Sequence, residues 1–362
     1  MSSWQRLLAI VAGLSALGAA ATALPQASSQ WLIVASGVFG AVSLTRFLRP
    51  VSYWLDGALA LIAGVAVLTS LGQPGAPLWL SLLAMWFFAW LFIDRVANAL
   101  ADGRLRLPGI GLIVPLAFGL TLLVMWEALV QGLNINHVLL PPPSAIWAKL
   151  TESVPTLWKD FQQTYLKGVL SGFALGTVIG LAVAIVVDRS PFLKRGILPI
   201  GNFASALPIV GVAPIMVMWF GYDWQSKAAV VVCVTFFPML INTLAGLNAA
   251  GRMEGDMMRT YAASYWQSLF KLRLPAAMPF IFNALKINST LALIAAIVAE
   301  FFGSPIVGMG FRISTGVGRL DVEMVWAEVA VAALAGSASY GLIALIERAV
   351  TFWHPSIRGG RT

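Results

Sequence analysis

The residues best suited to a specific chemical task in this 362-residue chain lie in one polar stretch, residues 249–275, between two long apolar segments. Its charged residues are Arg252, Glu254, Asp256, Arg259, Lys271 and Arg273. Its apolar residues include Met257, Met258, Tyr261, Tyr265, Trp266, Leu269 and Phe270. A helix of this composition has a charged side and a side rich in methionine and aromatic rings, which suits docking into a groove of another protein. We therefore predict that this stretch binds a partner; a helix lying on the lipid surface is the alternative.

Small and rigid residues predict how the stretch folds. Ala262 and Ala263 allow a sharp bend between two short helices. Pro275, followed by Pro279, should separate the loop helix from the next apolar segment, because proline lacks the backbone N–H that a helix interior needs.

The spacing within the stretch matches a known pattern, E-A-A, three residues, G, nine residues, I-x-L-P. The matching residues are Asp256, Met257, Met258, Ala262, Leu272, Leu274 and Pro275. Asp replaces Glu, two methionines replace the alanine pair, and Ala262 stands where the pattern usually has glycine. The stretch resembles the coupling loop of ATP-binding-cassette (ABC) importer permeases, and the resemblance implies an ATPase contact that also includes Tyr261 and Ala263.

Three further stretches resemble permeases of the nitrate, sulfonate and taurine branch. They are Leu139 to Ala145, the run from Leu207-Pro208 through Ala213-Pro214 to Gly221, and Ala299-Glu300 to Gly303 followed by Gly308 to Phe311. Together they cover residues 137–350. The resemblance implies a type I permease that pairs with a second copy, docks cytoplasmic ATPase subunits carrying ATP and Mg²⁺, and receives a small solute from an extracytoplasmic binding protein. The implied solute is a nitrate-, sulfonate- or taurine-like anion or a related nutrient, and a pyrimidine-type vitamin precursor stays open.

Catalytic and metal-binding motifs are absent from the sequence. There is no G-x-x-x-x-G-K-[ST] phosphate loop, so ATP hydrolysis would require a partner chain, and we expect a transport subunit without an enzyme activity or cofactor of its own. The single cysteine, Cys233, allows no internal disulfide. His137 and His354 lie far apart, which predicts no metal site. Gly308-Met309-Gly310 lacks the context of a dinucleotide site and is better interpreted as a turn.

Two features of the apolar segments indicate a transport pathway. Pro208 and Pro214 interrupt one segment, and a broken helix at membrane depth is tolerated where its backbone meets protein or a water-filled cavity. An ordinary packed kink is the alternative. Glu300 closes another apolar segment and is a candidate either for a gate near the outer mouth or for a structural anchor paired with one arginine. Gly308 and Gly310, in the turn that follows, join the pathway candidates.

Other polar and small residues are better explained by packing. Asp56 and Glu127 lie in apolar runs and are interpreted as interhelical hydrogen-bond partners rather than ligand contacts. Gly168, Gly172, Gly176 and Gly180 recur every fourth residue, and such a stripe lets another helix approach closely. That helix belongs either to the same chain or, alternatively, to a dimer partner.

Composition places these residues in an all-α integral membrane protein. The chain is 59% hydrophobic and 10% charged, with a mean hydropathy of +0.85. A helix needs roughly 20 residues to cross a bilayer core of about 30 Å. Ten apolar segments qualify: 7–24, 31–48, 53–72, 78–93, 109–132, 165–187, 198–219, 226–247, 279–299 and 324–346. The first has features of a signal peptide, but a retained helix is favoured because further segments follow at once.

The distribution of positive charge predicts the orientation. With ten spans and both termini in the cytoplasm, all but six of the 23 Lys and Arg residues fall on the cytoplasmic side, as the positive-inside rule requires. The six exceptions are Lys149, Lys159, Lys167, Lys227, Arg312 and Arg319. Orientation and contact with anionic lipid therefore account for the net charge of +8 without nucleic acid. We expect a multi-pass protein of the bacterial inner membrane.

These observations predict four regions. Residues 1–106 form a membrane extension of about four helices, 107–164 the first core helix and an outer interfacial segment, 165–350 the permease core with the loop 249–275, and 351–362 a cytoplasmic tail. The core would thus have six helices. The competing hypothesis is an ion-coupled secondary transporter, which the broken segment and the carboxylates Glu300, Glu127 and Asp56 would suit but which leaves the loop spacing unexplained.

Overall fold

The computed structural model describes residues 3–23, 37, 52–72, 75–105, 109–204 and 208–353. The chain divides into two compact units, Met1–Ala148 and Lys149–Thr362. All regular structure in the described residues is helical, as the sequence predicts. The division falls inside one short helix, and each unit is described separately below.

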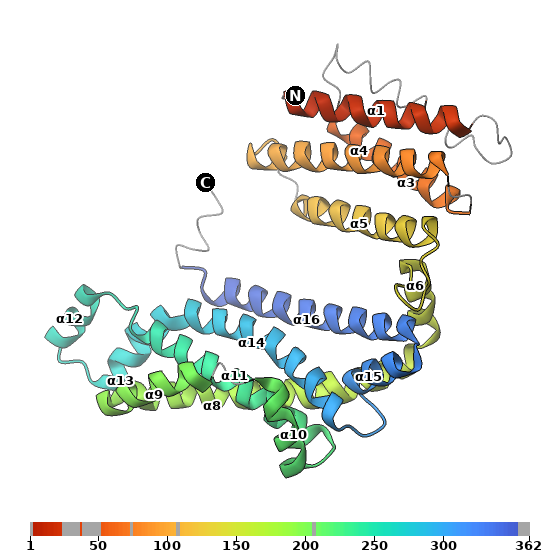
Figure 1. The fold of residues 1–362 in the computed structure, drawn as a ribbon. Coiled ribbons are helices and arrows are strands. Elements are labelled where there is room, and N and C mark those ends of the chain that lie inside the picture. Colours follow the sequence, from red (N-terminus) through yellow and green to blue (C-terminus); the bar gives the residue numbers. More distant parts are fainter. Residues whose placement is uncertain are drawn as a thin grey trace. The chain divides into compact units, whose positions relative to one another are not determined.

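The first unit is built from long apolar helices (Figure 1). They are α1 (Ser3–Ala23), α3 (Tyr53–Ser70), α4 (Ala76–Ala101), a short 3₁₀ turn (Ile110–Leu112) and α5 (Ile113–Gly132), followed by α6 (Pro143–Glu152), which contains the division. Helix α4 packs against α1 and α3, and α5 packs against α3 and α4. The predicted first core helix, α5, therefore lies with the N-terminal helices rather than with the second unit.

Polar residues of the first unit hold helices together, as predicted. The fully buried Asp56 of α3 forms an ion pair with Arg95 of α4. Glu127 of α5 accepts hydrogen bonds from the backbone N–H of Ser144 at 2.9 Å and from its hydroxyl at 2.6 Å, and so fixes the start of α6. Both carboxylates are thus structural hydrogen-bond partners.

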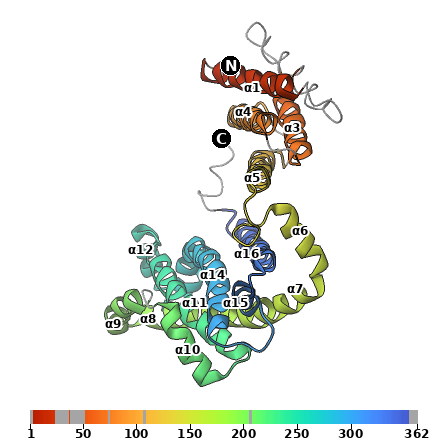
Figure 2. The ribbon, with the colours of Figure 1, turned by 45° about the vertical axis from the view of Figure 1, so that its right-hand side comes forward.

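The second unit is a bundle in which α8, α11, α14 and α16 are the long members (Figure 2). Its helices are α7 (Val154–Phe161), a π-helical turn (Gln162–Val169), α8 (Leu170–Arg189), α9 (Pro191–Ala204), α10 (Ile209–Phe220), α11 (Trp224–Leu247), α12 (Arg252–Thr260), α13 (Tyr265–Ser268), a second π-helical turn (Leu269–Arg273), α14 (Leu274–Phe302), α15 (Met309–Arg319) and α16 (Val322–Val350). Helix α11 lies between α8 and α14 and packs closely on both.

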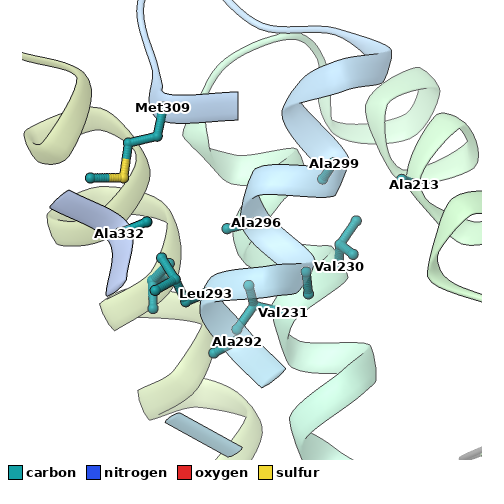
Figure 3. Close-up of a cluster of buried hydrophobic side chains, with 11 residues drawn as sticks. Ala213, Val230, Val231, Ala292, Leu293, Ala296, Ala299, Met309 and Ala332 are labelled. Carbon is teal, nitrogen blue, oxygen red and sulfur yellow. The ribbon is translucent and has the colours of Figure 1, made fainter. Parts of the chain in front are cut away.

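Small side chains make this close packing possible. The cluster in Figure 3 brings Val230 and Val231 of α11 against Ala292, Leu293 and other residues of α14. The side chains that complete it are Ala213 of α10, Met309 of α15 and Ala332 of α16 together with Val169, Ala295, Ala296 and Ala299. Alanines at the contact bring the helix axes together, as in membrane helix packing generally.

Gly172, Gly176 and Gly180 of α8, and Gly168 in the π-helical turn before it, face α11 of the same chain. A Cβ added to Gly176 would lie 2.1 Å from Thr235 Oγ1, and one added to Gly172 would lie 2.6 Å from the Ala228 carbonyl oxygen. A Cβ on Gly180 would lie 2.8 Å from the Phe236 carbonyl. Gly168 is less tightly packed, at 3.4 Å from Lys227 Cβ.

Eight helical runs in the described residues are long and apolar enough to cross a membrane. The predicted span 31–48 lies outside the described residues apart from Gly37. The predicted single span 198–219 is wrong: α9 ends at Ala204, α10 begins at Ile209, and α10 is too short at 12 residues to cross alone. Pro208 marks this break, because it precedes the first residue of α10 in an extended conformation.

Candidate functional site

The root of the polar loop is fixed to the bundle by a buried ion pair. Asp188, at the end of α8, accepts two hydrogen bonds from Arg273, at 2.7 and 2.8 Å, in the bidentate geometry of a strong pair. Arg273 also donates to the Leu247 carbonyl at 3.0 Å, and the Tyr265 hydroxyl donates to Asp188 at 3.1 Å. Arg189 lies over the Tyr265 ring, 5.7 Å from its centroid. Arg273 thus joins the end of the loop to α8 through Asp188, and it joins the start of the loop to the same site through the Leu247 carbonyl.

Beyond this root, α12 protrudes from the bundle without any buried side chain. It lies at the end of the second unit opposite α15, outside the bundle in both views (Figures 1 and 2). Its apolar side chains remain in the open, with Met253 83% and Tyr261 79% exposed and Met257 half exposed. Trp266 of α13 and Phe270 of the π-helical turn that follows stack on each other and are also exposed. A helix that exposes large apolar side chains together with charges has the properties of a docking element.

The bend predicted at Ala262 and Ala263 is present. Ala262 has φ 51°, in the left-handed region, and ends α12 while the chain reverses into α13. Ser264 and Gln267 then form a capping box that starts α13. This geometry explains why glycine suits the position, since glycine adopts positive φ without steric cost.

The residues predicted to contact the ATPase fall into two groups. Asp256, Met257, Tyr261 and Ala262 are exposed on or next to α12, and Met258 and Ala263 are half-buried beside them. Leu272, Leu274 and Pro275 are instead half-buried at the root, where Leu274 packs against a cluster that includes Leu269 and Ala277. The latter three therefore support the loop and do not form its outer surface.

The prediction that Pro275 and Pro279 separate the loop from the next span is wrong. Pro275 lies in the first turn of α14 and Pro279 lies inside α14, and neither proline interrupts the helical structure. The π-helical turn Leu269–Arg273 joins α13 to α14 without a break. Helical structure is consequently continuous from Tyr265 to Phe302.

A polar groove of about 620 Å³ lies between α12 and the root. Its walls include Asp188 and Arg273 on the bundle side and Asp256, Met258 and Arg259 on the α12 side. Lys194 of α9 and Asn248 also line the groove, and Lys194 donates to the Asn248 side chain at 2.8 Å. The groove shows that α12 is held at a distance from the bundle rather than packed on it.

At the opposite end of the second unit, Glu300 organises a buried polar network. Its carboxylate accepts hydrogen bonds from the Thr164 hydroxyl at 2.8 Å and from the Gly310 N–H at 2.7 Å. Thr164 in turn accepts from the Met309 N–H at 2.8 Å. The predicted arginine partner of Glu300 is wrong: the donors are the Thr164 hydroxyl and the backbone N–H of Gly310 in the first turn of α15. The choice between a gate and an anchor stays a prediction.

The arginine of this region pairs with another carboxylate. Arg312 donates to the fully buried Asp160 at 2.8 Å, and the Gly308 N–H donates to the same carboxylate at 2.7 Å. Gly308 has φ 134°, and a Cβ there would lie 2.6 Å from Glu300. Gly308 and Gly310 thus permit the backbone to approach two carboxylates. The turn interpretation holds for Gly308, which precedes α15, but not for Met309 and Gly310, which form the first turn of that helix.

Lys227, expected in an outer loop, is buried at the start of α11. Its ammonium donates to the Tyr222 carbonyl at 2.6 Å, to the Ser226 hydroxyl at 3.2 Å and to the Gly303 carbonyl. Nearby, Asp223 caps α11; hydrogen bonds from the Gln163 side chain and the Trp224 N–H hold the pKa of its carboxyl below the usual range. The loops before α11 and after α14 are therefore tied together.

The two prolines proposed to line a pathway are exposed. Pro208 precedes α10, and Pro214 lies inside α10, which continues through it. Most of α10 is open, with Met218 and Trp219 strongly exposed. The pathway role of both prolines stays a prediction.

Four buried residues of these networks were missed as site candidates: Asp160, Thr164, Asp188 and Glu328. The sequence could have identified Glu328 as a site candidate, because a carboxylate inside the apolar segment 324–346 is unusual. Asp188 and Asp160 adjoin apolar segments, and only the folded chain shows which cations they meet.

Several apolar helices long enough to cross a membrane, an exposed amphipathic helix between two of them and a tightly packed small-residue core define a multi-pass membrane protein with a docking element. Residues 176–352 match the model of the binding-protein-dependent transport system inner membrane component. The chain belongs to this family and is the multi-pass inner-membrane permease subunit of an ABC importer.

Individual relatives agree with this assignment. The chain is 31% identical over 255 residues to the riboflavin transport system permease protein RibX of Chloroflexus aurantiacus, covering 70% of this chain and 93% of that protein. It is 29% identical to the formylaminopyrimidine transport permease protein ThiX of Halalkalibacterium halodurans, over 66% of this chain and 95% of that protein. It is 30% identical to the taurine transport system permease protein TauC of Escherichia coli, over 66% and 88%.

Proposed function

We propose that α12 and the adjoining bend dock a separate ATP-hydrolysing subunit on the cytoplasmic side of the membrane. The observation that carries the proposal is the exposure of α12, whose methionine and charged side chains have no partner surface within the described part of the chain. Family membership supports an ATPase as the occupant, and the sequence contains no phosphate loop with which this chain could bind ATP itself.

The rigid root gives docking a mechanical consequence. The Asp188–Arg273 pair fixes the loop to α8, and the second π-helical turn continues into α14. A movement of the docked subunit would reach α8 and α14 directly, and both helices pack on α11. ATP binding and hydrolysis would thereby favour inward- or outward-facing arrangements of the bundle in turn. Two copies of the chain, each with its own α12, would form the pathway and receive solute from an extracytoplasmic binding protein.

The solute class follows only from the relatives. Names of relatives include a taurine permease, an aliphatic sulfonate permease and a formylaminopyrimidine permease. We infer that the solute is a small polar nutrient. It is either a sulfonate- or nitrate-like anion, as the taurine and sulfonate permeases suggest, or a pyrimidine-type vitamin precursor, as the formylaminopyrimidine permease suggests. Equilibrium binding of taurine, nitrate and formylaminopyrimidine to the cognate binding protein decides between them.

Co-purification from the native membrane tests the docking proposal. Wild-type chain should retain an ATPase subunit identified by mass spectrometry, whereas Asp256→Lys and Ala262→Trp should lose it. Ile306→Lys is the matched control for Asp256→Lys, because both side chains are strongly exposed but Ile306 lies in the loop after α14. Equal capture by all four chains, with unchanged thermal unfolding, would contradict docking on α12.

A further inference from the structure

Glu328 of α16 is a buried carboxyl group without a hydrogen-bond donor. Its side chain is 0% exposed, and neither carboxyl oxygen has a hydrogen-bond partner in the described part of the chain. An ionised carboxylate left in this state would be destabilised by the loss of its hydration. Glu328 is not part of the α12 surface proposed to dock an ATPase.

The neighbours of Glu328 offer it no free cation. Asp160 of α7 lies within hydrogen-bonding reach, and Arg312 of α15 and Glu300 of α14 are the other charged groups that act on it. Arg312 is already bound to Asp160 through Nε and Nη2, at 2.8 and 3.4 Å. Lys227 interacts with Glu300, and its ammonium is already hydrogen-bonded to carbonyl and hydroxyl oxygens. These five side chains form one charged cluster. If all of them were ionised, it would hold three carboxylates, Asp160, Glu300 and Glu328, and only two cations, Arg312 and Lys227.

One proton on Glu328 resolves both problems. It makes the cluster neutral, and it converts an orphaned acceptor into a donor toward Asp160, whose carboxylate has lone pairs beyond those used by Gly308 and Arg312. A metal ion would need more oxygen ligands, and no group of acidic, His or Cys side chains in the described residues has the geometry to hold one. We propose that Glu328 and Asp160 form a proton-binding site, in which a proton held on Glu328 is shared with Asp160.

The position of the site gives the proton a structural effect. Asp160 also receives the Gly308 N–H and Arg312, so the shared proton joins α16 to α7 and to the turn that begins α15. Release of the proton would place two negative carboxylates side by side in a buried site, and α15 would separate from α16. The turn bonded to Glu300 would lose one of its supports.

Infrared difference spectroscopy of the purified full-length chain tests the site directly. At neutral pH the wild-type chain should show the C=O stretch of a protonated carboxylic acid, shifted in D₂O, and Glu328→Gln should lose it. Glu347→Gln is the matched control on the same helix, because Glu347 is held as an ion pair by Lys286 at 2.7 Å and should contribute no such band. A wild-type spectrum without this band, or the same band in Glu328→Gln, overturns the proposal.

Asp160→Asn provides a second test should Glu328→Gln fail to fold. Removing the Asp160 charge frees Arg312 for Glu328, so Glu328 should ionise and the band should disappear; its persistence overturns the charge argument. Thermal unfolding gives an independent readout. The wild-type Tm should fall relative to that of Glu328→Gln as pH rises. At neutral pH the folded wild-type chain holds a proton on Glu328 that the unfolded chain lacks, so a lower proton concentration favours unfolding of the wild type and not of the variant. Parallel pH profiles of the two chains overturn the proposal.

Discussion

Ala262 pays a conformational cost that glycine would not, because its φ of 51° brings Cβ close to the carbonyl oxygen that follows. The left-handed region costs a non-glycine residue roughly 1–2 kcal/mol, which substitution by glycine would remove. The greater freedom of glycine in the unfolded chain offsets about 0.5–1 kcal/mol of this gain. We expect Ala262→Gly to stabilise the bend by up to about 1 kcal/mol. Amide hydrogen exchange of the peptide 252–268 should therefore slow. Ala263→Gly, at a neighbouring position with ordinary φ, should accelerate exchange instead, and equal effects of the two substitutions would contradict the assignment.

Two ion pairs of the same loop should differ sharply in their contribution to stability. Asp188 is 2% exposed and bidentate with Arg273, whereas Asp256 is 71% exposed and lies 3.4 Å from Arg259. Removing one member of a buried pair leaves an uncompensated charge and costs about 3–5 kcal/mol, while exposed pairs contribute about 0–1 kcal/mol. Thermal unfolding in detergent should show a large loss of Tm for Asp188→Ala and almost none for Asp256→Ala. Similar losses would show that Asp188 does not anchor the loop.

Individual residues also mark the limit of what the sequence predicts. The bend at Ala262 and the exposed position of Asp256 follow from local composition and spacing. The partner of Glu300 does not, because it is a backbone N–H presented by the Gly308 turn and a hydroxyl from Thr164, far away in the chain. Charged side chains in apolar segments are recognisable, but their pairing depends on packing, which is why Arg312 meets Asp160 and not Glu300.

At the scale of elements, contact between α8 and α11 depends on the glycine stripe. A methyl group on Gly176 would overlap Thr235 Oγ1, so Gly176→Ala should destabilise the bundle by about 1–3 kcal/mol through overpacking. Gly341→Ala in α16 is the control, since nothing lies within 4 Å of a Cβ at that glycine and alanine favours the helix by about 1 kcal/mol. Adding Thr235→Ala to Gly176→Ala should recover part of the loss. A Tm for Gly176→Ala equal to that of Gly341→Ala would contradict this packing.

Element type was predictable where hydrophobic runs were long, and less so where they were interrupted. The period of the glycines indicated the packed face of α8 correctly, because small residues every fourth position have one main use in a membrane helix. The run 198–219 is equally apolar, yet it contains α9 and α10, because Pro208 stops a helix while Pro214 is tolerated inside one. Pro275 shows the same ambiguity: in a first turn it begins α14 rather than separating it from the loop.

At the scale of the whole molecule, α12 and the loop after α14 should face opposite sides of the membrane. Helix α14 has 29 residues and is thus about 43 Å long, enough to cross the bilayer core of about 30 Å. Its preceding loop carries Arg252, Arg259, Lys271 and Arg273, which the positive-inside rule places in the cytoplasm.

Single-cysteine labelling measures this arrangement. In a Cys233→Ser background, which removes the native thiol, Met253→Cys should react with an impermeant maleimide only in inverted membrane vesicles. Ile306→Cys should react only in cells whose outer surface is accessible. Both parent side chains are more than 80% exposed, so differences in reactivity report sidedness rather than burial. Labelling of both positions from the same side would show that α14 does not cross the membrane. Labelling of Met253→Cys from the outside and of Ile306→Cys from the cytoplasmic side would show an inverted orientation. Helix α12 would then lie outside the cytoplasm, where no ATPase subunit could dock on it.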